Sequence, residues 1–85
     1  MESRIALIGI IVESRESIEK LNNILSEYSS YVIGRMGLPH QRNGVSIISI
    51  VLDAPNDIIS ALSGKIGMLP HITAKTIYSK ISQDK

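Results

Sequence analysis

Two long aliphatic runs, residues 4–13 and 45–53, limit the folds open to this chain more than any other feature. Both runs are rich in isoleucine and other β-branched residues, and both are apolar at successive positions. An extended segment of this kind is hydrophobic on both of its faces, which is typical of a strand in the middle of a covered sheet. We therefore predict two central strands, the second of which ends at Asp53.

Each of these strands is followed by a segment with helical periodicity. The first, residues 15–28, begins after Ser14, a residue suited to an N-cap, and the second begins within residues 54–57. Gly67 stands where the second helix is expected to stop. The predicted apolar stripes are Ile18, Leu21, Ile24, Leu25 and Tyr28 in the first helix, and Ile58, Ala61, Leu62 and Ile66 in the second.

Two weaker strands complete the pattern, at residues 31–37 and 72–81, with a loop at 38–44 between the second and third strands. They carry the glycine, lysine and threonine residues that suit sheet edges. The chain is expected to form a single domain, residues 1–85, with the α+β ferredoxin-like order β-α-β-β-α-β. The right-handed crossover rule then gives a four-stranded antiparallel sheet of order 4-1-3-2, with both helices on one face.

A sheet with both helices on one face leaves the other face bare, and this predicts self-association. The strand at 45–53 offers Val45, Ile47 and Val51 to one face and Ile48, Ile50 and Leu52 to the other. One of these rows has no cover within the chain, and a contiguous aliphatic patch is typical of an interface. The interface candidates are Ile47, Val51, Ile48 and Ile50, and we expect a homodimer or homotetramer. The alternative is an open face that is merely half solvated.

The charge balance argues against several classes of function. Nine Lys and Arg residues oppose eight Asp and Glu residues and are scattered singly, so direct DNA binding is not expected. The sequence has no cysteine, which excludes disulfides and thiolate nucleophiles and fits a cytoplasmic protein. The apolar run at residues 5–12 is too short to span a bilayer, so no membrane association is expected.

Two motifs give the chain a family resemblance. Residues 34–39 (Gly-Arg-Met-Gly-Leu-Pro) and 61–67 (Ala-Leu-Ser-Gly-Lys-Ile-Gly), with the strand that ends in Asp53, resemble the iron-only hydrogenase system regulators. That family is similar to ACT domains and to the C-terminal domain of nickel-responsive repressors, which are ferredoxin-like modules that oligomerise and bind small effectors. The resemblance implies a transcriptional regulator. The repressors carry a DNA-binding segment before this module, for which a first strand beginning by Arg4 leaves no room.

The resemblance to ACT domains places one candidate effector site between the first strand and the first helix, at Ser14 and Arg15. Free backbone N–H groups and the dipole at a helix N-terminus favour an anion there. The alternative is an ordinary N-cap beside a surface arginine.

A second candidate effector site surrounds Arg35, which stands between two glycines. Gly37 allows close approach of a ligand or another backbone, and arginine suits a carboxylate or phosphate. Pro39 and Arg42 follow closely, the second adding a positive charge. The alternative is an edge strand that uses Arg35 to resist unwanted pairing.

Metal binding and catalysis find less support. His40 is a weak candidate metal ligand and His71 another, but a single histidine is not a site unless symmetric copies supply a second. Residues 64–67, Gly-Lys-Ile-Gly, lack the spacing of a phosphate loop. The sequence shows no triad, no paired acids in an apolar setting and no metal quartet, so we expect neither an enzyme nor a cofactor.

The function that these patterns favour is a regulatory module that oligomerises, binds a small effector, for which an anion is the candidate, and acts through a protein partner. The family resemblance links it to an iron-only hydrogenase system. A metal sensor of the nickel-repressor type is the first alternative, and a ligand-free scaffold or maturation accessory is the second.

Overall fold

The computed structural model describes residues 3–40 and 44–80, with residues 39 and 40 described by their backbone alone. The elements are β1 (Arg4–Val12), α1 (Arg15–Glu27), the 3₁₀ turn η1 (Ser29–Tyr31), β2 (Val32–His40), β3 (Val45–Ala54), α2 (Asn56–Gly67) and β4 (Ile72–Tyr78). Strand, helix and strand follow one another twice along the chain, as the sequence predicts.

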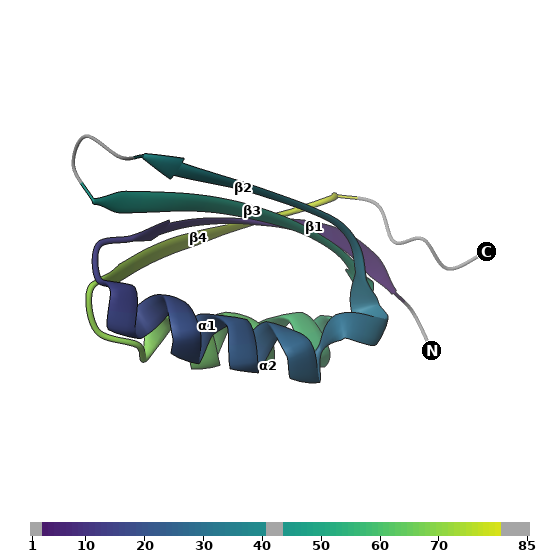
Figure 1. Cartoon of the computed structure of the whole chain (residues 1–85). Helices are drawn as coiled ribbons and strands as arrows, with labels where there is room; N and C mark the ends of the chain where they lie inside the picture. The colour runs from purple at the N-terminus through teal and green to yellow at the C-terminus, as the bar shows by residue number, and fades with distance from the viewer. Residues whose placement is uncertain (1–2, 41–43, 81–85) are drawn as a thin grey trace.

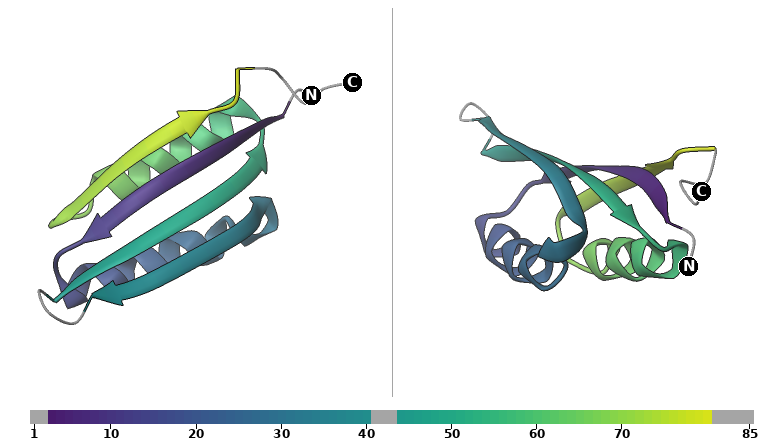
Figure 2. Two further views of the ribbon diagram at one scale, coloured as in Figure 1. Left: turned by 90° about the horizontal axis from the view of Figure 1, so that it is seen from above. Right: turned by 90° about the vertical axis from the view of Figure 1, so that its right-hand side faces the viewer.

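The four strands form one antiparallel sheet in the order β2-β3-β1-β4, which is the predicted order 4-1-3-2 viewed from the other edge. Both helices cover the same face of this sheet (Figure 1). Seen from above, α1 lies beneath the β2–β3 side and α2 beneath the β1–β4 side (Figure 2). The two doubly apolar strands are therefore the central pair, and the ferredoxin-like α+β fold is confirmed.

The register of the central strands sorts their side chains into two rows. Ile8 stands opposite Ile50, and Leu7 stands opposite Val51, so even-numbered residues of both strands share one face. The even row is buried beneath the helices and consists of Ala6, Ile8, Ile10, Val12, Ile48, Ile50, Leu52 and Ala54. The expectation that Ile48 or Ile50 lies at an oligomer interface is therefore wrong, because the helices of the same chain already cover both.

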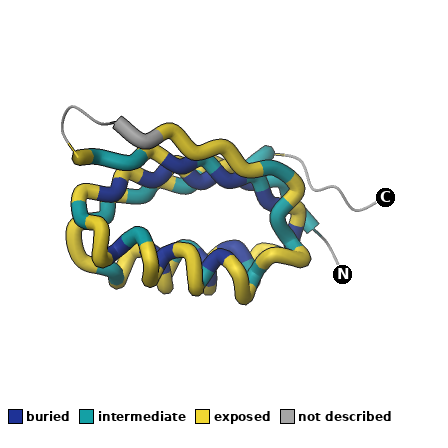
Figure 3. Tube along the Cα trace, in the orientation of Figure 1, coloured by how far each residue is buried: buried dark blue, intermediate teal, exposed yellow. Residues whose placement is uncertain are grey.

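The odd-numbered row lies on the face that the helices leave open. Leu7, Ile11 and Ile47 are 38–43% exposed although they occupy central strands. Met36 and Leu38 of β2 and Ile77 of β4 extend this surface toward both sheet edges with 59–67% exposure. We call these six residues the open sheet face, and Figure 3 shows exposed positions recurring along the strands above the helices.

The helices agree with the predicted stripes in α1 and differ in α2. All five predicted residues of α1 are buried or half-buried. In α2, Ile59 is buried and Ala61 is exposed, so the stripe is offset from the prediction. α2 ends at Gly67, as the sequence predicts, but Gly67 is its last helical residue and not a left-handed cap, and Met68 follows with a right-handed backbone.

Three local predictions change in the structure. Ser14 occupies the N-cap position of α1, but its side chain makes no capping hydrogen bond. β2 runs on through Pro39 to His40, where a loop was expected. An edge strand tolerates proline, which has no backbone N–H, because the outer side of that strand has no neighbouring strand to which an N–H would donate. β4 ends at Tyr78, earlier than expected, although the Ser79 N–H still donates to the Ile5 carbonyl oxygen at 2.9 Å.

Candidate functional site

Two adjoining hollows run between α1 and the edge strand β2, and we call them together the α1–β2 groove. Their volumes are about 320 Å³ and about 240 Å³. Asn22 and Arg35 border both hollows. The larger hollow is further lined by Leu25, Ser26, Ser29, Val32 and Ile50. The smaller one is lined by Ile18, Gly37, Leu38, Ser46, Ile47 and Ile48.

A β-bulge in β2 decides which face of the sheet Arg35 occupies. The register against β3 shifts by one residue between Val32 and Gly34. Without that shift, alternation would place Arg35 opposite Ser49, on the open sheet face. The shift instead places Arg35 opposite Ile50, on the face that the helices cover.

Arg35 therefore projects toward α1, where it meets Asn22. Its Nη2 atom donates a hydrogen bond to the Asn22 Oδ1 atom at 2.7 Å. Both side chains are solvent-exposed, because they stand at the sheet edge beyond the buried core. Sequence reasoning missed Asn22. The signal was available, since Asn22 follows Ile18 by four residues and so borders the apolar stripe of α1.

The Arg35–Asn22 contact leaves a corner rich in hydrogen-bond donors. The amide oxygen of Asn22 accepts from Arg35, and the amide nitrogen of the same side chain carries two further N–H donors. A guanidinium carries five N–H donors, and the contact with Asn22 uses one of them. None of the described residues that line either hollow is acidic. This arrangement favours an anion over a cation.

Gly37 lies on the same face as Arg35, opposite Ile48. A Cβ atom placed on Gly37 would meet nothing within 4 Å, so the glycine keeps the smaller hollow open rather than relieving a close contact. Pro39 is the next residue of β2 on this face, opposite Ser46, and its side chain lies outside the described part of the chain. Arg42 lies outside the described residues altogether.

The other predicted effector residues do not join this groove. Ser14 and Arg15 stand at the N-terminus of α1, and neither lines either hollow. Asn22 lies seven positions after Arg15 in α1, which corresponds to a distance of about 10 Å along the helix axis. The structure thus brings Arg35 and Gly37 together and leaves the helix start as a separate location within one chain.

The two histidines stand at opposite edges of the sheet. His40 is the last residue of β2 and His71 directly precedes β4, and both lie at the same end of the strands. Three strand spacings separate them, about 14 Å. Among the described residues, no group of three or more His, Cys, Asp or Glu side chains could hold a metal ion. His71 also has a left-handed backbone with φ of 60°.

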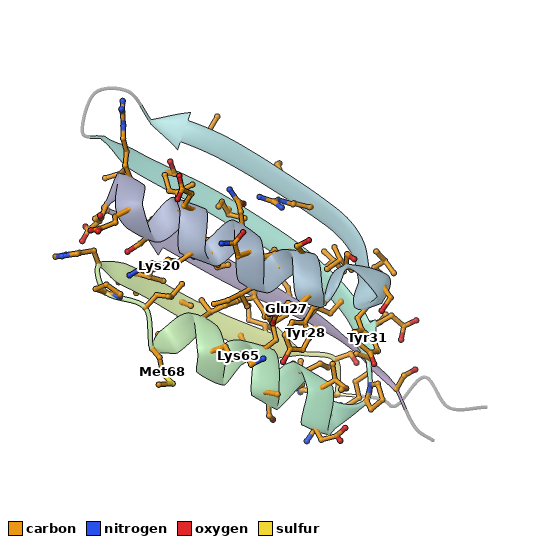
Figure 4. The ribbon with its side chains drawn as sticks, turned by 60° about the horizontal axis from the view of Figure 1, so that its bottom comes forward. Lys20, Glu27, Tyr28, Tyr31, Lys65 and Met68 are labelled. Atoms are coloured by element: carbon orange, nitrogen blue, oxygen red, sulfur yellow. The ribbon has the colours of Figure 1, made fainter. Side chains whose placement is uncertain are left out.

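The motif at residues 61–67 has a structural explanation. Lys65 reaches from α2 to α1, where its Nζ atom lies 3.4 Å from the Glu27 Oε1 atom and 5.1 Å from the centre of the Tyr28 ring. Figure 4 shows these three side chains gathered between the two helices. Hydrogen bonding and charge interaction with Tyr28, and then with Glu27, raise the pKa of Lys65 above its usual value. The lysine joins the helices and stands apart from the groove.

Comparison with known families gives one match. The family model described as TM1266-like, a provisional iron-only hydrogenase system regulator family, matches residues 4–76. A comparison with curated proteins gives no match. None of the helices in the described ranges is long and apolar enough to cross a membrane.

Solved structures extend this result. The uncharacterized protein TM1266 from Thermotoga maritima superposes with a TM-score of 0.89 and 32% identity, covering 93% of this chain and 100% of that one. The ACT domain of GTP pyrophosphokinase from Chlorobium tepidum superposes with a TM-score of 0.73 and 14% identity, covering 88% of this chain and 99% of that one. The C-terminal domain of the MgtC protein from Mycobacterium tuberculosis superposes with a TM-score of 0.66 and 9% identity, covering 96% of this chain and 94% of that one. The last two show the fold alone.

Proposed function

Since the chain belongs to the TM1266-like family of iron-only hydrogenase system regulators, we propose that it is a regulatory module that binds a small anionic effector in the α1–β2 groove. It does so as a homo-oligomer and passes the signal to a protein partner, without catalysing a reaction and without binding DNA itself. The cytoplasm is the compartment in which such a module would act.

The observation that carries this proposal is the donor corner formed by Arg35 and Asn22. Exposed arginines are common, but this one is held by a 2.7 Å hydrogen bond at the boundary of two hollows. Its remaining N–H groups and the Asn22 amide have no acidic neighbour among the groove-lining residues that the structure describes. A charged group held at the edge of an apolar concavity is the usual form of a small-ligand site.

The open sheet face supports the oligomeric part of the proposal. Its six aliphatic or thioether side chains come from all four strands and are 38–67% exposed. Monomeric proteins rarely expose this many large apolar side chains on one face of a sheet unless that face binds something. A symmetric partner stacked on this face would bury Ile47 and leave the α1–β2 groove accessible on the other side of the sheet.

The test is a thermal-shift screen of small organic acids, phosphates and divalent metals with the wild-type protein and two variants. Arg35→Ala is expected to weaken binding of any stabilising anion about tenfold or more, because a charge-assisted contact contributes roughly 1.5–3 kcal/mol. Arg15→Ala is the matched control, since it removes the same charge outside the groove. Loss of binding in Arg15→Ala alone would move the site to the helix start and contradict the proposal.

The metal-sensor alternative makes a different prediction in the same screen. If nickel, zinc or iron stabilises the protein, the organic anions have no effect and His40→Ala abolishes the metal response, then the chain is a metal sensor. No response to any compound would favour the ligand-free scaffold.

A further inference from the structure

We infer that the larger hollow of the α1–β2 groove takes a small aliphatic monocarboxylate that lacks an ammonium group. This inference rests on the proposed function and narrows it to one ligand class. It comes from three features of the hollow: its single cation, the absence of acidic lining residues, and its apolar wall.

The polar end of the hollow matches one carboxylate. Arg35 supplies the one formal charge among the described residues that line this hollow, and Asn22 supplies neutral N–H donors beside it. The planar guanidinium and the adjacent amide suit the two oxygens of a carboxylate. A phosphate dianion carries about twice that charge and would call for a second cation. The hydroxyls of Ser26 and Ser29 line the same hollow and add neutral partners.

The lining also discriminates against an α-amino acid. A ligand ammonium group placed near Arg35 would meet like charge, and no acidic residue lines either hollow within the described part of the chain. An ammonium group that loses water without gaining a partner opposes binding. A carboxylic acid or 2-oxo acid avoids this cost.

The rest of the hollow fits a short hydrocarbon chain. Leu25, Val32 and Ile50 form its apolar wall. Its volume of about 320 Å³ lies at the small end of the range of roughly 300–1,000 Å³ found for small-molecule sites. A branched chain of a few carbons would contact this wall while its carboxylate reaches Arg35.

The experiment is isothermal titration calorimetry of the full chain with four matched probes. They are 4-methylpentanoate, 4-methyl-2-oxopentanoate, leucine and 4-methylpentan-1-ol, with inorganic phosphate as a fifth compound. We expect the two acids to bind, and leucine, the alcohol and phosphate to bind at least tenfold more weakly. Leucine binding as tightly as 4-methylpentanoate, or no binding by either acid, would overturn the inference.

Four variants locate the site, each checked for an unchanged circular dichroism spectrum. Arg35→Ala and Asn22→Asp are expected to weaken binding of the acids at least tenfold, the second because a carboxylate beside Arg35 neutralises it. Ser26→Leu, which fills the larger hollow from an exposed helix position, is expected to do the same. Arg15→Ala removes the same charge at a position that lines neither hollow and is expected to leave affinity within about twofold. Unchanged affinity in Ser26→Leu would show that the ligand does not occupy the larger hollow, and a tenfold loss in Arg15→Ala would place it at the helix start; either result would overturn the assignment.

The outcomes separate this inference from the proposed function. If other anions bind in an Arg35-dependent way while the aliphatic acids do not, the effector groove stands and the ligand class is wrong. If the acids bind equally well to wild type and Arg35→Ala, the groove itself is not the effector site and both ideas fail.

Discussion

Arg35 of β2 donates from its Nη2 atom to the Asn22 Oδ1 atom of α1 at 2.7 Å, across thirteen positions of sequence. This hydrogen bond joins the edge strand to the helix where the two elements separate into a groove. It exists because a one-residue register shift between Val32 and Gly34 turns Arg35 toward the helices. A local irregularity of the sheet thus places the charge on which the candidate site depends.

Opposite faces of β3 should respond differently to a charge. Ile48→Glu buries a carboxylate beneath the helices and is expected to unfold the domain, at a cost of several kcal/mol. Ile47→Glu places the same group on the open sheet face and is expected to leave folded protein with a smaller assembled mass. Circular dichroism and light scattering measure the two effects. A wild-type monomer at micromolar concentration would contradict the proposed assembly.

Ser17 should contribute measurably to stability. It is almost fully buried on α1, and its hydroxyl donates to the Pro70 carbonyl oxygen at 2.5 Å, which ties α1 to the connection between α2 and β4. Ser17→Ala is expected to cost about 0.5–1.5 kcal/mol of unfolding free energy. Ser60→Ala, at an exposed position of α2, is the control and should change stability by less than about 0.5 kcal/mol. Urea titration distinguishes them, and equal effects would refute the role of Ser17.

The left-handed backbone at position 71, rather than the imidazole ring of His71, should decide which residues this position accepts without loss of stability. Its φ of 60° lies in the left-handed region, and its carbonyl oxygen accepts from the Glu13 N–H at 2.8 Å. His71→Gly is expected to be at least as stable as wild type, whereas His71→Val should cost about 1–2 kcal/mol. Thermal unfolding of the wild type and the two variants measures this order of stability. Destabilisation by glycine as large as that by valine would show instead that the imidazole itself is needed.

The contacts of Lys65 with Tyr28 and Glu27 should make the free energy of unfolding depend on pH in the alkaline range. Tyr28 and then Glu27 raise the pKa of Lys65 in the folded chain above the value of 10.5 for an unperturbed lysine. The stability that these contacts contribute is therefore fully present below pH 10.5, and it is lost as the pH rises through the pKa that Lys65 has in the folded chain. NMR titration of the Lys65 side chain measures the shift. Tyr28→Phe is expected to reduce it more than Glu27→Gln, and an unchanged pKa in both variants would contradict this explanation.

Most of the fold could be predicted because the sequence repeats one hydrophobic pattern twice. Runs that are apolar on both faces can be satisfied only in the middle of a covered sheet, which identified the β1 and β3 segments as the central pair. The stripe of α1 followed in the same way from its 3.6-residue period. The predicted stripe of α2 was offset, because Ile58 and Ile59 are adjacent and the prediction used Ile58, whereas the structure buries Ile59.

The candidate site was predicted only in part. Arg35 and Gly37 stood out because glycines surround a charge in an apolar strand. Asn22 did not, because an exposed asparagine on a helix is ordinary until a partner from another element faces it. Ser14 and Arg15 formed a separate candidate site by analogy with ACT domains, and the structure keeps them outside the groove, with Arg15 about two turns of α1 from Asn22.

The sequence by itself determined the order of the elements, the central position of two strands and the existence of an uncovered aliphatic face. These follow from local periodicity and from the rule that apolar surface must be covered. Only the tertiary structure decided which row of β3 is uncovered and which way Arg35 points. Both depend on strand register, and a shift of one residue exchanges the two faces of a strand at little cost in local propensity.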